Sequence, residues 1–457
     1  MKVHDNILSA IGHTPLVKLN KLVGANDATV LLKCEFLNPG GAIKDRMALY
    51  ILDQAEKRGL LQPGGVIVEN TSGNTGMGVA LWAAVKGYRC VFTMPDKMSA
   101  EKVNRLKALG AQVVVTPTNV PAESPHSYYE TAKRIARETP GAFYVNQYHN
   151  PDNIEAHYRS TGPELWEETE GKFDAFVAGL GTGGTMSGAG RYFKEKNPRI
   201  RNIGVDPVGS VYQGYFKTGK LPQPHVYKVE GIGEDMLCKA MDFSVLDDVR
   251  QVDDKQSFMA ARRLAREEGI FAGGSSGSAV HVAVELAREL GRGKTIVTIL
   301  PDSGNSYISK FYSDEWMRDN GFLVDERGPG SVRDVIAHRK MGVISARKGE
   351  RVGEVVETMR KHGISQMPVN EDGDRAVGMI HEYDLLNALV SGAHRISDAI
   401  DPIIAPMQGV VSPGASIQQL RDVFAQDNVA VVKDGERVIG IVTKIDLIEY
   451  LAERMAQ

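Results

Sequence analysis

The feature that most constrains this 457-residue chain is an alternation of short apolar runs with amphipathic stretches between about residues 60 and 310. The apolar runs have the length and composition of buried strands, and the stretches between them have helical periodicity. Strands that alternate with helices form right-handed crossovers and a mostly parallel sheet. We therefore predict an open α/β fold with strands at 66–68, 89–94, 112–116, 175–178, 202–205 and 295–300.

Composition and charge narrow the classes of partner. Hydrophobic residues make up 42% of the chain, which is enough for more than one core, and the formal net charge is only −3. Without a block of like charge, neither nucleic acid nor a membrane surface is the expected partner. Cys34, Cys90 and Cys238 are widely separated, and residues 1–20 lack the apolar core of a signal peptide. We expect a cytoplasmic protein with small-molecule ligands.

Turn-forming and charged residues interrupt the alternation at 319–331, where we predict a linker between a domain at 1–318 and a second domain at 332–457. The second domain contains an internal repeat, because Asp372–Leu386 matches Asp434–Ile448. Each copy is predicted to form a strand, an Asp-Gly turn, a strand and a helix. One copy is too small to bury its apolar face, so the two copies should pack as a pair.

Glycine-rich segments mark where chemistry is expected in the first domain. Lys44 follows Gly40 and Gly41, which free the backbone, and it opens a predicted helix that can present its amine. Ligands of open α/β sheets gather at the loops after the carboxyl ends of the strands, where helix N-termini can bind phosphate. Three further glycine-containing turns follow strands or precede helices, at residues 71–76, 181–185 and 273–277.

In their order and spacing, these motifs resemble the fold-type II pyridoxal phosphate enzymes of the cysteine synthase and cystathionine β-synthase family, over roughly residues 4–317. The resemblance implies that Lys44 bonds to pyridoxal 5′-phosphate, that Asn74 holds its 3′ oxygen and that Ser275 faces its ring nitrogen. A hydroxyl at Ser275 cannot hold a proton on that nitrogen as a carboxylate would, which favours β-elimination and replacement. The resemblance also implies cofactor contacts at Gly181, Thr182, Gly183, Gly184, Thr185, Pro301 and Asp302.

The same resemblance implies a β-replacement of the serine hydroxyl by a thiol, with Lys44 removing the α proton; homocysteine as the thiol would give cystathionine. Tyr148 is expected to assist departure of the hydroxyl. Glu234 either positions the amine of the second substrate or is an ordinary loop acid. The expected substrate-binding residues are Thr71, Ser72, Thr75, Gln147 and Gly231.

Several alternatives remain open at this point. Cysteine synthase and serine or threonine dehydratase share much of the site, and a nucleotide sensor without activity would leave Lys44 unused. Gly179, Gly181 and Gly184 also satisfy the G-x-G-x-x-G spacing of a dinucleotide site, with Asp206 at the end of the next strand. Each motif alone is also compatible with an ordinary loop or helix start, but their co-occurrence favours the pyridoxal phosphate enzyme.

The repeated module resembles the tandem CBS-domain (Bateman) module, which implies an adenosyl ligand such as S-adenosylmethionine or AMP. Thr443 and Asp446 are placed either to hold ribose or phosphate or merely to cap a helix, and His381 replaces the threonine in the first copy. Because the resemblance to the catalytic domain begins close to Met1, we expect no N-terminal haem-binding extension, no haem and no metal site. The resemblance implies a homodimer, with a higher homo-oligomer formed through the repeated module as the alternative.

Overall fold

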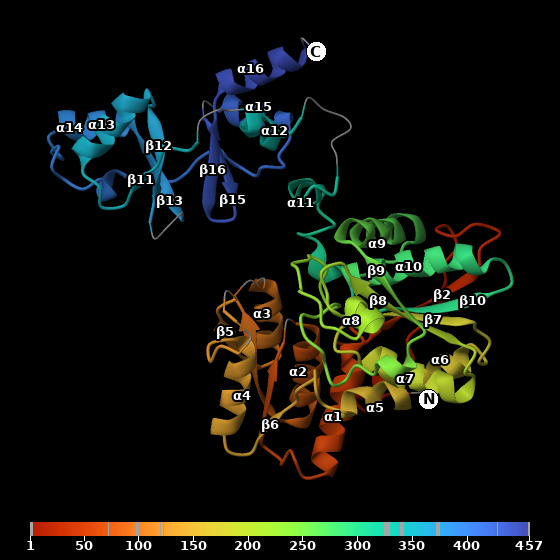
Figure 1. Ribbon diagram of the computed structural model, residues 1–457. Coiled ribbons are helices and arrows are strands. Elements are labelled where there is room, and N and C mark those ends of the chain that lie inside the picture. Colours follow the sequence, from red (N-terminus) through yellow and green to blue (C-terminus); the bar gives the residue numbers. More distant parts are fainter. Residues whose placement is uncertain are drawn as a thin grey trace. The chain divides into compact units, whose positions relative to one another are not determined.

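The computed structural model describes residues 3–71, 73–96, 98, 100–118, 120–121, 123–323, 330–338, 342–371, 375–426 and 428–455. The chain divides into two compact units, Met1–Phe311 and Tyr312–Gln457 (Figure 1). The first unit holds the glycine-rich segments, and the second holds the repeat.

The first unit is built on two sheets. The larger sheet has the order β1 (Leu16–Lys18), β2 (Thr29–Cys34), β10 (Thr295–Leu300), β7 (Ala175–Gly179), β8 (Arg201–Pro207) and β9 (Asp248–Val252). Its strands pair in parallel, apart from the antiparallel pair β1–β2. The smaller sheet is parallel throughout, with the order β5 (Gln112–Thr116), β4 (Arg89–Pro95), β3 (Val66–Asn70) and β6 (Ala142–Tyr144).

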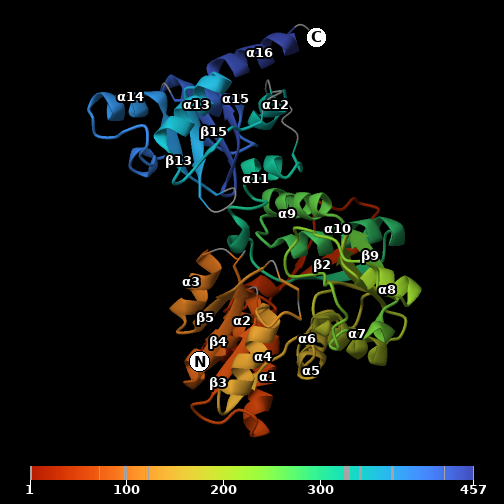
Figure 2. The same cartoon turned by 60° about the vertical axis from the view of Figure 1, so that its left-hand side comes forward.

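Helices cover both faces of each sheet (Figures 1 and 2). On the larger sheet, α9 (Asp254–Glu268) and α10 (Gly274–Leu290) lie on one face, and α5 (Asp152–Arg159), α6 (Thr161–Glu168) and α7 (Gly184–Lys196) lie on the other. On the smaller sheet, α4 (Tyr128–Glu138) lies opposite α1 (Lys44–Lys57) and α2 (Asn74–Lys86), and α3 (Ala100–Ala108) packs beside β5. The shorter α8 (Tyr212–Thr218) packs near β9.

Burial on both faces explains why the central strands are continuous apolar runs. In β7, Val177 belongs to the core beneath α10, whereas its neighbours Phe176 and Ala178 belong to the core beneath α7. The predicted α/β fold is confirmed, and all six predicted runs are strands, although they are divided between the two sheets. The prediction omitted β1, β2, β6 and β9.

The second unit contains two three-stranded sheets of the same plan. The first comprises β11 (Ala346–Arg347), β12 (Gln366–Asn370) and β13 (Ala376–His381), and the second comprises β14 (Val410–Val411), β15 (Ala430–Asp434) and β16 (Arg437–Val442). In each, a parallel pair is followed by an antiparallel pair. The helices of this unit are α11 (Asp314–Asp319), α12 (Val332–His338), α13 (Val352–His362), α14 (Glu382–Val390), α15 (Ile417–Ala425) and α16 (Lys444–Met455).

The strand–strand–helix order predicted for both copies is therefore confirmed, while the turn of the first copy, at residues 372–374, lies outside the described residues. The copies pack together as predicted, through a small core formed by Ala376, Met379, Val431 and Val438. The Ala376 N–H also donates to the Glu436 carbonyl oxygen (3.1 Å).

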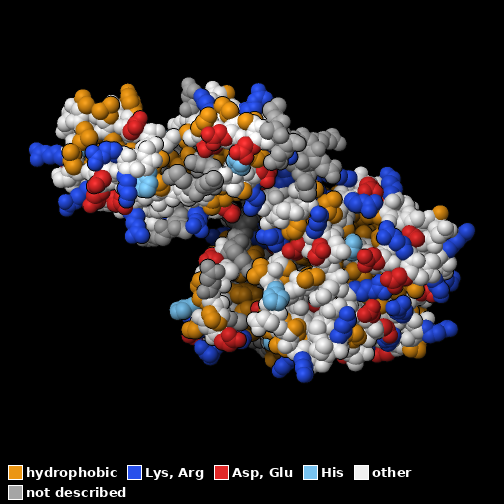
Figure 3. Space-filling model, turned by 45° about the horizontal axis from the view of Figure 1, so that its top comes forward, with side chains coloured by type: hydrophobic (Ala, Val, Ile, Leu, Met, Phe, Trp, Pro, Cys, Tyr) orange, Lys and Arg blue, Asp and Glu red, His pale blue; other side chains and the backbone are white. Residues whose placement is uncertain are grey.

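Positive and negative side chains are interspersed on the face of the molecule seen in Figure 3. Within the described ranges, every helix is too short or too polar to span a lipid bilayer. The same part of the chain contains no group of three or more His, Cys, Asp or Glu side chains arranged to hold a metal ion.

Candidate active site

Lys44 is the first residue of α1, as predicted, and it follows a tight turn. Gly41 has φ +87°, a left-handed backbone that favours glycine, and the Gly40 N–H donates to the Asp45 carboxylate (2.5 Å). The Lys44 side chain keeps some accessible surface, yet it lies deep enough that desolvation lowers its pKa, against the attraction of Glu234, Cys238 and Asp302. A lysine of lowered pKa is more often neutral and is therefore a better nucleophile and base.

The segment after β7 forms a cradle of backbone N–H groups at the start of α7. Gly183 has φ +94°, and a Cβ atom there would lie 2.5 Å from Cα of Met241. At Gly184, a Cβ atom would lie 2.0 Å from Oδ1 of Asn153. Only glycine fits at these positions, and the first N–H groups of a helix are left free to bind an anion. Thr182 and Thr185, also predicted here, flank the two glycines.

Two residues of α5, neither of which was predicted, support this cradle from behind. Asn153 Nδ2 donates to the Thr182 hydroxyl (2.9 Å), and one helical turn later His157 Nε2 lies 3.3 Å from the Thr185 hydroxyl. Burial, together with the positive charges of Lys44 and Arg46, holds the pKa of His157 well below its usual range. The imidazole is therefore neutral, and it orients Thr185 without adding charge beside the cradle.

We predict that Gly183→Ala weakens cofactor binding by at least about tenfold, because a side chain in the left-handed region costs about 1–2 kcal/mol and the added carbon overlaps Met241. Titration of the cofactor-free protein with pyridoxal 5′-phosphate measures the change. The matched control is Gly87→Ala, since Gly87 has φ +79° but open space around it. Equal affinities of the two variants would contradict a cradle at Gly183.

Asn74, at the start of α2, is held by residues that follow β10. Its Nδ2 donates to the Asp302 carboxylate (2.8 Å), which also accepts from the Tyr307 hydroxyl (2.7 Å). The Pro301 carbonyl accepts from the Ile43 N–H (2.8 Å), so the same segment is tied to the turn before Lys44. Oδ1 of Asp302 is buried and has no hydrogen-bond partner among the described residues, which leaves one acceptor available at this place.

Ser275, Gly231 and Gly181 come from three separate segments and lie beside one another. Ser275 is buried in the first turn of α10. A Cβ atom at Gly231 would lie 3.8 Å from the Ser275 hydroxyl, and one at Gly181 would lie 2.9 Å from the Gly231 carbonyl oxygen. The structure therefore brings these three predicted residues together.

The turn after β3 places Thr71 and Thr75 at the carboxyl end of the smaller sheet. The Thr71 hydroxyl accepts from the N–H groups of Gly73 (3.0 Å) and Gly76 (3.2 Å), which closes the turn. Ser72, predicted here as a substrate ligand, lies outside the described residues.

A buried hydrogen-bonded chain runs behind this turn. The Thr75 hydroxyl donates to Gln147 Oε1 (2.7 Å), and Gln147 Nε2 donates to Glu69 Oε1 (3.2 Å). Burial raises the pKa of Glu69 to about 8, so this carboxyl is mostly protonated at neutral pH. This chain of hydrogen bonds fixes the orientation of the Gln147 amide, and Glu69 was not among the predicted site residues.

Tyr148 and Glu234 lie within electrostatic reach of one another, and Glu234 also lies within reach of Lys44. Burial raises the pKa of Glu234 to about 8, and Asp235 adds to the shift while Lys44 opposes it. The Tyr148 hydroxyl lies 3.5 Å from that of Tyr128, the first residue of α4. Tyr128 was not predicted, because nothing in its sequence neighbourhood marks it.

The dinucleotide alternative is not supported by the position of its acidic residue. Asp206 is fully buried in β8 and accepts a hydrogen bond from the Gln213 N–H (2.9 Å) at the start of α8. Its carboxylate therefore forms a hydrogen bond within the fold and is not exposed to a ribose hydroxyl.

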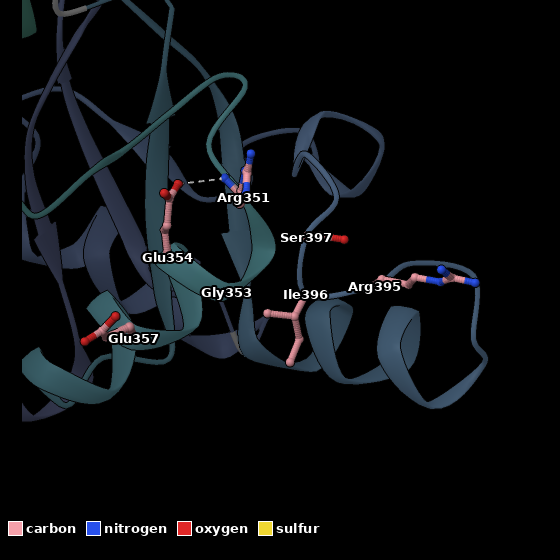
Figure 4. A pocket seen from close by; sticks show the side chains of 7 residues that line it. All are labelled: Arg351, Gly353, Glu354, Glu357, Arg395, Ile396 and Ser397. Atoms are coloured by element: carbon pink, nitrogen blue, oxygen red, sulfur yellow. Dashed lines mark hydrogen bonds between the residues drawn. The ribbon is translucent and has the colours of Figure 1, made fainter.

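In the second unit, Thr443 and Asp446 are hydrogen-bonded to each other at the start of α16. The Thr443 N–H (2.7 Å) and hydroxyl (2.6 Å) both donate to the Asp446 carboxylate, as in a helix cap. A separate open cavity of about 760 Å³ lies elsewhere in this unit (Figure 4). At this cavity the Glu354 carboxylate accepts a hydrogen bond from the Arg351 N–H, and the Arg395 side chain points away from the other lining residues. It is lined by Arg351, Gly353, Glu354, Glu357, Arg395, Ile396 and Ser397.

Comparison with known proteins follows the same division of the chain. A family model described as "Pyridoxal-phosphate dependent enzyme" matches residues 7–302, and one described as "CBS domain" matches residues 332–391 and 398–453. The chain belongs to the pyridoxal-phosphate dependent enzyme family. The lowered pKa of the Lys44 amine and the backbone N–H groups at the start of α7, where added Cβ atoms at Gly183 and Gly184 would overlap Met241 and Asn153, fit this cofactor.

Relatives over the whole length are more specific. A cystathionine beta-synthase of Oryctolagus cuniculus is 39% identical over 99% of this chain and 86% of its own length. A cysteine synthase of Staphylococcus aureus is 45% identical but covers only 67% of this chain and 96% of its own length. Within its family, the chain is an enzyme of the β-synthase type.

One solved structure is also informative. An O-acetylserine dependent cystathionine beta-synthase from Helicobacter pylori superposes with a TM-score of 0.63 at 35% identity, covering 68% of this chain and 99% of its own.

Proposed function

We propose that this chain condenses L-serine with L-homocysteine to give L-cystathionine and water. The observation that carries the proposal is the placement of the Lys44 amine, which has a lowered pKa and lies within electrostatic reach of Asp302 beside Asn74 and of His157 beside the phosphate cradle. Whole-length relatives named cystathionine beta-synthase support it.

Bound at this site, pyridoxal 5′-phosphate would supply an electron sink for the α carbon of the amino acid. Lys44 holds the cofactor covalently, Asn74 and Ser275 contact its ring, and Pro301 and Asp302 fix these contacts from the end of β10. The phosphate is held by Gly181, Thr182, Gly183, Gly184 and Thr185. We propose that the protein binds no haem. The absorption spectrum of the purified protein tests for bound pyridoxal 5′-phosphate and for haem.

The substrate residues form a second set. Hydroxyl and N–H groups suit a carboxylate, so the serine carboxylate is placed on the turn at Thr71, Ser72 and Thr75, with Gln147 and Gly231 beside it. As a neutral amine, Lys44 would take the α proton of the bound serine. Tyr148 gives a proton to the leaving hydroxyl.

Product analysis tests the function directly. The enzyme is incubated with serine alone, with serine and homocysteine, and with O-acetylserine and sulfide, and the products are identified by mass spectrometry. Cystathionine formed only when homocysteine is present supports the proposal. Keto acid released from serine alone would indicate a dehydratase, and cysteine formed from O-acetylserine without turnover of serine would indicate a cysteine synthase. Because the Helicobacter pylori relative is an O-acetylserine dependent cystathionine beta-synthase, the enzyme is also incubated with O-acetylserine and homocysteine. Cystathionine formed in this incubation but not with serine would contradict serine as the substrate.

For Glu234 we propose a contact with the ammonium group of homocysteine. Because its pKa is raised to about 8, the carboxyl ionises as the pH rises through this value, and attraction for the ammonium group grows until that group itself loses its proton at higher pH. We predict that the KM for homocysteine falls as the pH approaches about 8 in the native enzyme and that E234Q removes this change, with an effect of about tenfold near pH 8.

The thiol itself also ionises in this range, so the control is a thiol without an amine, such as 2-mercaptoethanol. Its pH dependence should be the same for the native enzyme and for E234Q. A parallel loss with both thiols would show that Glu234 acts on the thiol or on Lys44 instead.

We also propose that residues 1–318 form the catalytic domain, that 319–331 are a linker and that 332–457 form a regulatory module. Residues 312–318, which include most of α11, cluster with the second unit. The module is proposed to bind an adenosyl compound at Thr443 and Asp446, which requires their mutual hydrogen bond to open. Calorimetric titration of the whole chain with S-adenosylmethionine and with AMP, repeated with T443V, tests this site. A homodimer is proposed by resemblance, and analytical ultracentrifugation tests it.

A further inference from the structure

Tyr128 is held in place beside Tyr148, the residue that is proposed to protonate the leaving hydroxyl of serine. Its carbonyl oxygen accepts from the Thr93 hydroxyl (2.6 Å), and the preceding Ser127 caps α4 by accepting from the Glu130 N–H (3.1 Å). The bond from Thr93, a residue of β4, ties the start of α4 to the smaller sheet. The phenol hydroxyl of Tyr128 lies 3.5 Å from that of Tyr148, and a bond of this length commonly shortens when substrate binds.

Aromatic packing fixes the side chains of Tyr128 and Tyr148 relative to each other. The ring of Tyr129 lies 4.0 Å from the ring of Tyr128 and 5.8 Å from that of Tyr148, where it meets the ring edge-on. The three rings therefore form one cluster from two segments that are distant in the sequence.

The surroundings oppose any negative charge on these phenols. Burial raises the pKa of Tyr128 to about 12 and that of Tyr148 well above its usual range, and the nearby carboxyl of Glu234 acts in the same direction on both. The hydrogen bond between the two phenols raises the pKa of Tyr148 and lowers that of Tyr128, which corresponds to Tyr148 as the donor before the reaction, so the bond must reverse when Tyr148 gives up its proton. A Tyr148 that must give up its proton in this place needs a donor to stabilise the oxygen that is left behind.

We propose that Tyr128 is a positioning residue that donates its O–H to the Tyr148 oxygen while Tyr148 protonates the departing β-hydroxyl of serine. This inference rests on the proposed function, since it requires a substrate whose leaving group needs a proton. It adds a residue that lies behind Tyr148 and does not itself touch the substrate.

The proton balance closes without a further reagent. The Cβ–O bond of serine breaks with its electron pair on oxygen, the Tyr148 proton joins that oxygen, and water leaves. The resulting Tyr148 phenolate, held by the Tyr128 O–H, takes the proton of the incoming thiol as sulfur bonds to Cβ. Lys44 returns the proton that it removed from Cα.

The leaving group provides the test. Acetate departs from O-acetylserine as a stable anion and needs no proton, so Tyr128 should matter for serine and not for O-acetylserine. We expect Y128F to lower kcat with serine and homocysteine by about 10- to 100-fold, within the range for loss of acid–base assistance. With O-acetylserine and homocysteine, kcat should stay within about twofold of the native enzyme, and KM for serine should change little.

The control is Y158F, which removes a phenol hydroxyl bonded to Glu195 on the surface of the first unit. It should leave both rates unchanged. If Y128F loses activity equally with serine and with O-acetylserine, or keeps full activity with both, the inference for Tyr128 is overturned. The proposed function is unaffected by either result as long as the native enzyme makes cystathionine from serine. A native enzyme that turns over O-acetylserine but not serine would overturn both. Cofactor absorbance identical to that of the native enzyme shows that Y128F is folded and loaded.

Discussion

Replacement of Lys44 by alanine is expected to abolish both the covalent attachment of the cofactor and turnover, with a loss of at least about 1,000-fold in kcat. The amine is the only group at the start of α1 that can form such a bond, and burial lowers its pKa, which favours the neutral, nucleophilic form. The covalent bond is detected as a mass increase of the native protein after borohydride reduction.

The control for this prediction is Lys86→Ala. Lys86 is the last residue of α2, lies at the surface and forms an ion pair with Glu56. That variant should keep both the adduct and the activity. An adduct of unchanged yield on K44A would place the reactive amine elsewhere in the chain and would refute the proposed site.

The second large effect concerns stability. Arg46 is buried and bonds Glu35 (2.7 Å) and Glu164 (2.7 Å), and Lys33 bonds Glu164 from the other side. Although burial opposes ionisation, hydrogen bonds from Arg46 and Lys33 hold the pKa of Glu164 at about 2. Arg46→Met leaves Glu35 buried with too few partners, so we expect a loss of about 3–5 kcal/mol in the free energy of unfolding.

Urea unfolding followed by tryptophan fluorescence measures this loss. The matched control is Arg263→Met, because Arg263 forms an exposed pair with Glu267 within α9, and such pairs contribute less than about 1 kcal/mol. A loss for R46M no larger than that for R263M would mean that the buried carboxylates are neutral or are solvated by water.

The sheet architecture and the main loops were predictable because they depend on local patterns. Continuous apolar runs such as 295–300 predict strands buried on both faces, and a parallel sheet gathers the loops that follow them. The strand β2 was omitted because Lys33 interrupts its apolar run. That charge is tolerated only because Glu164 and Glu168, far away in the sequence, neutralise it.

The supporting residues were not predictable for a related reason. Asn153 and His157 are ordinary polar residues of a helix until α5 packs against α7, at a distance that Gly184 and Gly188 permit. Tyr128 similarly acquires a partner only when α4 is placed beside the segment after β6. Such roles arise from contacts between distant segments, which sequence periodicity does not record.

The turn before Lys44 joins two halves of the first unit. Ile43 packs in the core of the larger sheet and is clipped to the end of β10, whereas Met47, one turn further along α1, packs in the core of the smaller sheet. Lys44 therefore lies between the cores of the larger and the smaller sheet. A change in the packing of either sheet is therefore transmitted to the backbone that carries the reactive amine.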